Sequence, residues 1–453
     1  MHEQRRAMNR RRFIAGLSAA GVGSTLMPGA LAAVAQDADE ITVEMLEAAQ
    51  RIAGLRFTPE ELLTIASRLN GSTNEAAYGT LRAANLGNST QPALVFNPVP
   101  PGMTLPTARR PMRREEVTIA LPATDAELAF LPVTHLAKLI ETRRVTPSQL
   151  TELYLDRLKR HNQTLHCVVS LTEELARHQA RQADAEIAAG TYRGPLHGIP
   201  WGAKDLLAVR GTKTTWGASP FKDQTIDTDA TVYSRLTEAG AILIAKLSMG
   251  ALASGDRWFG GRVRNPWNPE QGASGSSAGP GSATAAGLVG FAIGTETRGS
   301  IISPSTRNGV TGLRPTFGRV SRYGAMTLAW SMDKIGPMCR AAEDCALVLD
   351  TIQGPDGRDN TVLDVPFNWD ATADVRRLRV GYLRSIEDDI ADDPQNPGRV
   401  ASARQTLSNN RAALDAIRGW VCRWRRSTCL ICRPRRPASS SAPRRLRRSM
   451  WRR

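Results

Sequence analysis

Residues 272–282 of the sequence read GASGSSAGPGS, and residues 294–300 read GTETRGS. Both stretches are rich in glycine and serine, and the apolar segment 288–293 lies between them. A single Gly/Ser run is more often a flexible linker than a site. Here the first run leads into a helical pattern and the second ends an apolar strand pattern. The pair therefore predicts two tight turns joined to regular structure.

Around these turns the chain alternates short apolar strands with helical patterns, which is typical of an α/β fold whose sheet is covered by helices. A helix should follow the Thr146 cap, where Pro147 occupies the first helical position. We also expect helices at 174–189, 230–239, 282–287, 341–352 and 401–417, and strands at 241–245, 289–294 and 378–382.

Other segments make a family resemblance specific. Residues 198–205 read GIPWGAKD, residues 303–305 read SPS, residues 312–321 read GLRPTFGRVS and residues 331–337 read SMDKIGP. With the two turns, they resemble the amidase signature over about residues 128–357. The resemblance implies an amidase-signature α/β fold with a central twisted mixed sheet. It also implies an enzyme that hydrolyses a carboxylic amide C–N bond through an acyl-enzyme.

The resemblance further implies a Ser-Ser-Lys triad, with Ser300 as the nucleophile, Ser276 as the bridging serine and Lys204 as the base. A serine hydroxyl must lose its proton as it attacks. A lysine can accept that proton only when it is neutral, and burial lowers a lysine pKa. The ordinary alternatives are an exposed surface lysine at 204 and a helix N-cap serine at 276, a role that Ser277 could equally have. In the family the peptide bond before the bridging serine, here that of Gly275, is cis.

Amide cleavage passes through a tetrahedral oxyanion, which backbone N–H groups must stabilise. The candidate donors are Thr297, Arg298, Gly299 and Ser300. Arg298 departs from the signature, which often has glycine or an apolar residue at this place. Its long, positively charged side chain either narrows the acyl pocket or selects an acidic substrate, and the sequence leaves both outcomes open.

Other hydrolytic mechanisms have less support. All six histidines lie at or before His197, ahead of both serine-rich turns, so the Ser…Asp…His order of α/β-hydrolases is excluded. The chymotrypsin-like order stays open but has no supporting motif. Ser219 and Lys222 match the Ser-x-x-Lys of penicillin-binding enzymes without its partner motifs. No His/Cys spacing in the body suggests zinc, and Cys429 and Cys432 form an isolated pair. We expect no cofactor and no metal.

The N-terminus resembles a twin-arginine signal. Residues 9–15 read NRRRFIA, and a modestly apolar run follows to the small-x-small pattern at Ala33, Val34 and Ala35. The alternative is an ordinary basic N-terminus. The run is too short and glycine-rich for a spanning helix, and no later segment is long enough, so we expect an exported protein without a membrane span.

The chain divides into five parts. We expect a signal peptide at 1–35, a helical segment at 36–91, a proline-rich linker at 92–127, the amidase-signature domain at 128–418 and a basic tail at 419–453. The domain should be incomplete at its C-terminus, because the family normally continues well beyond the nucleophile.

The net charge of +16 is concentrated at the ends of the chain. Residues 419–453 carry twelve arginines and no acid, and the first 36 residues carry five arginines against Glu3. The body is nearly neutral, so we expect no nucleic-acid partner. The tail resembles out-of-frame translation of a GC-rich gene more than a nucleic-acid or membrane tail.

Three functions follow from the sequence. The first is an exported amidase, a possible homodimer, that acts on a small-molecule or peptide amide. The second is the glutamine-hydrolysing subunit of a tRNA-dependent amidotransferase, against which the export signal argues. The third is a truncated or non-catalytic relative that acts as a binding protein.

Overall fold

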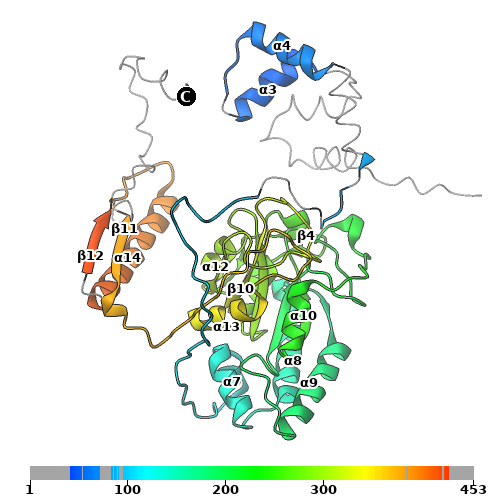
Figure 1. The fold of residues 1–453 in the computed structure, drawn as a ribbon, viewed down its shortest axis with the longest axis vertical. Coiled ribbons are helices and arrows are strands. Elements are labelled where there is room, and N and C mark those ends of the chain that lie inside the picture. Colours follow the sequence, from blue (N-terminus) through cyan, green and yellow to red (C-terminus); the bar gives the residue numbers. More distant parts are fainter. Residues whose placement is uncertain are drawn as a thin grey trace, which may run out of the picture.

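Figure 1 shows the computed structural model of the chain. It describes residues 41–427 apart from 54, 72–82, 85, 89, 91–94, 384, 385, 387, 421 and 422. The expected signal peptide and residues 428–453 of the expected tail lie outside the described residues. None of the described helices is both long and apolar enough to cross a bilayer.

The central sheet is mixed, as expected, and has six strands in the order β1-β3-β2-β8-β10-β9. β2 pairs in parallel with β3 and β8, whereas β1, β10 and β9 run antiparallel to their neighbours. Every residue of β2, β3, β8 and β10 is buried, because helices pack against this part of the sheet. The strands are β1 (Val168–Leu171), β2 (Pro200–Lys204), β3 (Ile242–Leu247), β8 (Phe291–Glu296), β9 (Thr311–Gly312) and β10 (Lys334–Cys339).

Most helices pack around this sheet. α9 contacts β3, α11 contacts β8 and β2, and α13 contacts β10. The helices of the body are α6 (Asp125–Ala129), α7 (Val133–Glu141), α8 (Pro147–Leu165), α9 (Glu173–Ala188), α10 (Thr231–Glu238), α11 (Ala278–Ala285), α12 (Ile302–Asn308) and α13 (Ala342–Ile352). Short 3-10 turns are η1 (Ser219–Phe221), η2 (Ala251–Ala253) and η3 (Val375–Arg377).

The predicted N-terminal helices are present as α3 (Val43–Ala53) and α4 (Pro59–Leu69). Thr58 caps α4 and forms a capping box with Glu61, which satisfies backbone N–H groups that the first helical turn leaves free. Thr146 makes the same reciprocal pair with Gln149 at the start of α8, as the sequence indicated.

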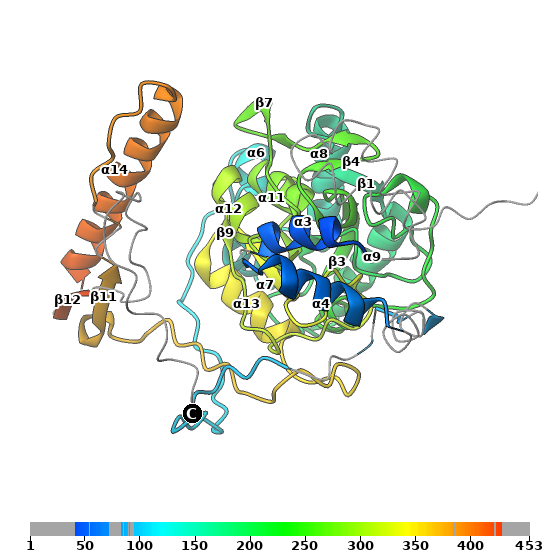
Figure 2. The same ribbon diagram turned by 90° about the horizontal axis from the view of Figure 1, so that it is seen from above.

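Other small sheets lie outside the body's main sheet. β4 (Arg257–Trp258) pairs with β5 (Gly261–Arg262), and β6 (Arg264–Asn265) pairs with β7 (Asn268–Gly272). β11 (Arg379–Leu383) pairs in parallel with β12 (Arg423–Ser427), and α14 (Pro397–Trp420) connects them. Figure 2 shows this β11-α14-β12 unit beside the body. The composition of the expected tail did not predict β12.

Two of the elements that differ from the sequence expectation, α11 and β10, do so for a physical reason. α11 begins at Ala278, four residues before the expected start, and includes Gly279, Pro280 and Gly281. These are poor helix formers, but every residue of α11 is buried, so tertiary packing outweighs propensity. β10 was not expected as a strand, because it contains Gly336 and Pro337.

Candidate active site

The topology brings three chain segments to one edge of the sheet. β2 and β8 are parallel, so their carboxyl ends, at Lys204 and Glu296, lie at the same edge. β10 is antiparallel to β8, and its first residue, Lys334, pairs with Glu296. The turn 297–300 and the residue before β10, Asp333, therefore belong to the same edge as Lys204.

Lys204 has no exposed surface, and its ammonium group is surrounded by oxygen atoms. Nζ lies 2.8 Å from Ser276 Oγ, 3.0 Å from Ser277 Oγ and 2.8 Å from Thr295 Oγ1. Burial lowers the pKa of Lys204 to about 7, although the negative charges of Asp333 and Glu296 act in the opposite direction. The alternative of an exposed surface lysine is wrong.

Ser276 and Ser277 are buried at the start of α11, and the Gly275–Ser276 peptide bond is cis. Ser277 has a structural role, because its hydroxyl accepts from Thr295 N at 3.1 Å and donates to Thr295 O at 3.0 Å. Gly275 has no room for a side chain, since an added Cβ would lie 1.8 Å from the Gly255 carbonyl oxygen. Glycine is therefore required here by close packing of the two loops.

Ser300 is half-buried and lies at the end of the second turn. Its carbonyl accepts a hydrogen bond from Ser277 N at 3.1 Å, which ties the two turns together. Gly299 before it has φ of +93°, a conformation that favours glycine. Among the described residues, no hydrogen bond joins the hydroxyls of Ser276 and Ser300. The structure thus brings Lys204 and Ser276 within hydrogen-bond distance and places Ser300 beside them through the backbone.

Sequence reasoning missed Glu296, which organises the turn. Its Oε2 accepts from Ile301 N at 2.9 Å and Ile302 N at 3.0 Å. Burial raises the pKa of Glu296, but hydrogen bonds from the backbone of Ile302, Ile301 and Gly299 outweigh that effect and lower it. An acid at the end of a buried strand, four residues before Ser300, was the available signal.

Asp333 is a second residue that sequence reasoning missed. Thr297 Oγ1 donates to its Oδ1 at 2.5 Å, and Leu328 N and Ala329 N donate to its Oδ2 at 2.8 and 3.0 Å. Lys334 Nζ donates to the carbonyl of Thr297 at 2.8 Å. The residues before and within β10 therefore hold the first part of the turn in place.

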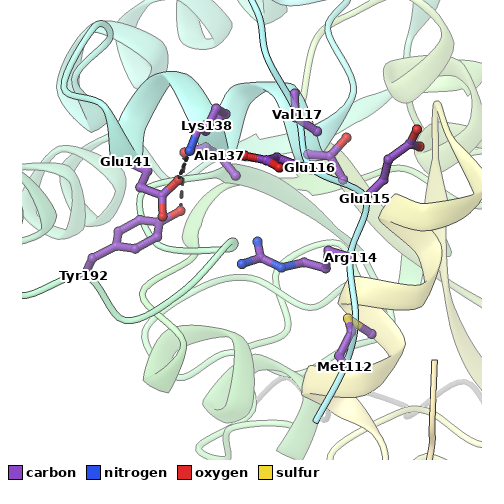
Figure 3. Close-up of a pocket in the computed structure, with 10 residues that line it drawn as sticks. Met112, Arg114, Glu115, Glu116, Val117, Ala137, Lys138, Glu141 and Tyr192 are labelled. Atoms are coloured by element: carbon purple, nitrogen blue, oxygen red, sulfur yellow. Dashed lines mark hydrogen bonds and ion pairs between the residues drawn. The ribbon is translucent and has the colours of Figure 1, made fainter. Parts of the chain in front are cut away.

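A small cavity lies at this edge of the sheet. It has a volume of about 10 Å³, enough for one water, and is lined in part by Thr295, Thr297 and Asp333. A larger cavity of about 330 Å³ lies elsewhere and includes none of the predicted site residues. Figure 3 shows Arg114 and Tyr192 at this larger cavity. It does not coincide with the Lys204 cluster.

A buried ion pair supports the strand that carries Lys204. Lys246 Nζ lies 3.0 Å from Asp205 Oδ1, and neither side chain is exposed. Asp205 also accepts from Thr215 N at 2.9 Å. In the part of the chain that the structure describes, no three His, Cys, Asp or Glu side chains gather as a metal site would require.

The family model for Amidase matches residues 149–418. The chain belongs to the amidase family. A subunit of glutamyl-tRNA(Gln) amidotransferase from Azoarcus sp. is 41% identical over 297 residues, which are 63% of this chain and 60% of the relative. The same amidotransferase subunit from Coxiella burnetii is 41% identical over 255 residues, 55% of this chain and 53% of the relative. The chain thus spans little more than half of these curated relatives.

Solved structures support the amidase fold. The native peptide amidase from Stenotrophomonas maltophilia is similar to this chain with a TM-score of 0.58 and 32% identity. That match covers 66% of this chain and 62% of the peptide amidase. The mixed sheet with its covering helices is therefore the amidase-signature fold that the sequence predicted.

Proposed function

We propose that the protein is an amidase that cleaves a carboxylic amide C–N bond through Ser300, Ser276 and Lys204. The observation that carries this proposal is the buried Lys204 ammonium group, 2.8 Å from Ser276 Oγ, with a pKa of about 7. A lysine with such a pKa is neutral in a substantial fraction of molecules at neutral pH, so it can accept a proton.

In the proposed reaction, Ser300 Oγ attacks the amide carbon while its proton passes through Ser276 to Lys204. The oxyanion accepts hydrogen bonds from backbone N–H groups of the turn Thr297–Ser300. The C–N bond breaks as the proton returns through Ser276 to the leaving nitrogen. Water then attacks the Ser300 ester, which releases the carboxylic acid and restores the Ser300 hydroxyl.

Labelling with a fluorophosphonate tests the nucleophile. Ser300 should be the modified residue, and Ser300→Ala should abolish labelling while circular dichroism stays unchanged. Ser219→Ala is the matched control, because Ser219 belongs to the competing Ser-x-x-Lys match and should not affect labelling. Modification of Ser219 instead would overturn the triad.

A second candidate function is glutamine hydrolysis within a larger amidotransferase assembly. The names of the Azoarcus and Coxiella relatives favour it. Glutaminase activity that appears only when other subunits of such an assembly are added would support this function. Hydrolysis of simple amides by the chain alone, with hydroxylamine capturing the acyl group, would support the first. If hydroxylamine traps no acyl group in either setting, the non-catalytic alternative holds.

We also propose that the protein is exported, because residues 9–15 and 33–35 resemble a twin-arginine signal. Fusion of residues 1–40 to a folded reporter should direct it out of the cytoplasm. Replacement of Arg11 and Arg12 by lysine should retain the reporter in the cytoplasm. Export of the lysine variant would count against this route.

A further inference from the structure

Arg298 occupies the middle of the turn that carries Ser300, and its side chain is exposed. Among the described residues, no carboxylate forms an ion pair with it and no carbonyl accepts a hydrogen bond from its guanidinium group. The neighbouring space is open, because a Cβ built on Gly299 would meet no atom within 4 Å. Arg298 is thus a cation with free donors two residues from Ser300.

Two acids that contact this turn are already engaged by other groups. The Glu296 carboxylate accepts the N–H groups of Ile301 and Ile302, and Asp333 accepts from Thr297 Oγ1 and two further backbone N–H groups. Neither acid neutralises Arg298. Among the described residues, the Arg298 guanidinium is therefore left without a carboxylate partner.

Two further basic residues lie beside the turn. Lys334 Nζ donates to the carbonyl of Thr297, but burial lowers its pKa and so favours its neutral form. Arg314 Nε lies 3.8 Å from Glu296 Oε1 and compensates that acid. Arg298 is thus an exposed cation at the turn, and such a cation attracts and orients anionic ligands.

We propose that Arg298 binds a carboxylate of the substrate, and that the preferred substrates are monoamides of short dicarboxylic acids. This inference rests on the proposed amidase function and adds the substrate class. A planar guanidinium pairs with a carboxylate through two parallel hydrogen bonds, which is stronger and more directional than a contact with a neutral group. The amide carbon would then be held at Ser300 by the anchored far end of the acyl chain.

The test compares matched amides in the full chain. Succinamate, glutaramate and adipamate are each assayed against butanamide, pentanamide and hexanamide, in which a methyl group replaces the carboxylate. We expect kcat/KM to favour the acidic member of at least one pair. In Arg298→Gln this preference should fall by roughly 10- to 100-fold, the usual effect of removing a charge-assisted hydrogen bond. Arg298→Glu should reverse it in favour of amides that end in an ammonium group.

Arg307→Gln is the matched control. Arg307 is an exposed arginine in the last turn of α12, and the one described hydrogen bond of its guanidinium goes to Gln271. Arg307→Gln should leave the ratio of kcat/KM for acidic amides to kcat/KM for neutral amides unchanged. Two results would overturn the proposal while the amidase function stands. One is a ratio of acidic to neutral kcat/KM at or below one in the native protein. The other is a ratio that Arg298→Gln leaves unchanged. If Arg298→Ala raises kcat/KM for acidic and neutral amides equally, the side chain only narrows the pocket.

A binding measurement separates this inference from the proposed activity. Glutarate is a product of the expected reaction, and calorimetry should detect its binding to the native chain. The affinity should fall in Arg298→Gln and remain in Arg307→Gln. Binding of glutarate without cleavage of any amide would contradict the proposed function but uphold the carboxylate site. If glutarate and pentanoate bind equally, the carboxylate site is wrong.

Discussion

At the residue scale, the chemistry depends on the protonation of Lys204. Its three closest oxygen partners are hydroxyl groups, which can donate to a neutral amine as well as accept from an ammonium. The cluster therefore accommodates both states of the lysine. A carboxylate in the same place would have fixed the charged form.

The pH dependence of activity follows from this lowered pKa. Below about pH 7 Lys204 is protonated and cannot accept the proton of Ser276, so kcat/KM should rise with pH through about 7 and then level off. Lys204→Ala should lose activity by roughly 10³-fold or more, since the general base is absent. A rate that stays constant from pH 5 to pH 9, with an active Lys204→Ala variant, would show that Lys204 is only structural.

Stability should depend on pH through the same residue. Because the pKa of Lys204 is about 7 when folded and ~10.4 in an unfolded chain, the unfolded state binds more protons between these values. The free energy of unfolding should therefore rise from pH 7 to pH 10, by a few kcal/mol at most. Urea unfolding of Lys204→Met should show a smaller rise, because the buried Lys246 and Lys334, whose pKa values burial also lowers, still contribute. Lys213→Met, which removes an exposed lysine, should retain the full rise.

Glu296 gives a third prediction at this scale. Glu296→Gln replaces a charged acceptor of two backbone N–H groups with a neutral one, so it should destabilise the protein by about 1–3 kcal/mol. Because the turn positions Ser300, fluorophosphonate labelling should also slow. Thermal unfolding and labelling rates measure the two effects. Glu270→Gln, at an exposed residue of β7, should change neither. Unaltered labelling in Glu296→Gln would exclude the positioning role.

At the scale of elements, the two Gly/Ser turns depend on backbone contact. The loop before α11 packs so closely on residue 255 that glycine is required at 275. Gly275→Ala should therefore displace the loop that carries Ser276 and lower both the melting temperature and the labelling of Ser300. Gly398→Ala in α14 is the control, because an added Cβ there meets no atom and alanine favours a helix. Equal effects of the two substitutions would contradict the packing argument.

At the scale of the whole molecule, the chain beyond residue 418 lies outside the match to the Amidase family model. β12 pairs with β11, so this strand has a structural partner. The sequence beyond it, residues 428–453, contains arginines and no acidic residue that could pair with them. Deletion of residues 428–453 should leave the melting temperature unchanged and improve solubility. Deletion of residues 421–453 should destabilise the β11-α14-β12 unit. Loss of a salt-dependent affinity for nucleic acid or anionic lipid after the shorter deletion would show that the tail is functional.

The sequence by itself determined the α/β class, the capped helix at Thr146 and the paired turns around Ser276 and Ser300. Each of these depends on local patterns: periodicity, a capping residue within one turn, or glycine at a tight turn. The resemblance supplied the family and the proposed triad, and family membership is established. The burial of Lys204 was only a plausible expectation, since nothing in its local sequence fixes its surroundings.

Only the tertiary structure placed Glu296 and Asp333 around the turn, started α11 at Ala278 and paired β10 with β8. These features join residues that are distant in the chain or that have poor local propensity, and long-range packing decides them. The same holds for the lowered pKa of Lys204. Its cause is the removal of water by strands and loops from three parts of the chain, which exists only once the sheet has formed.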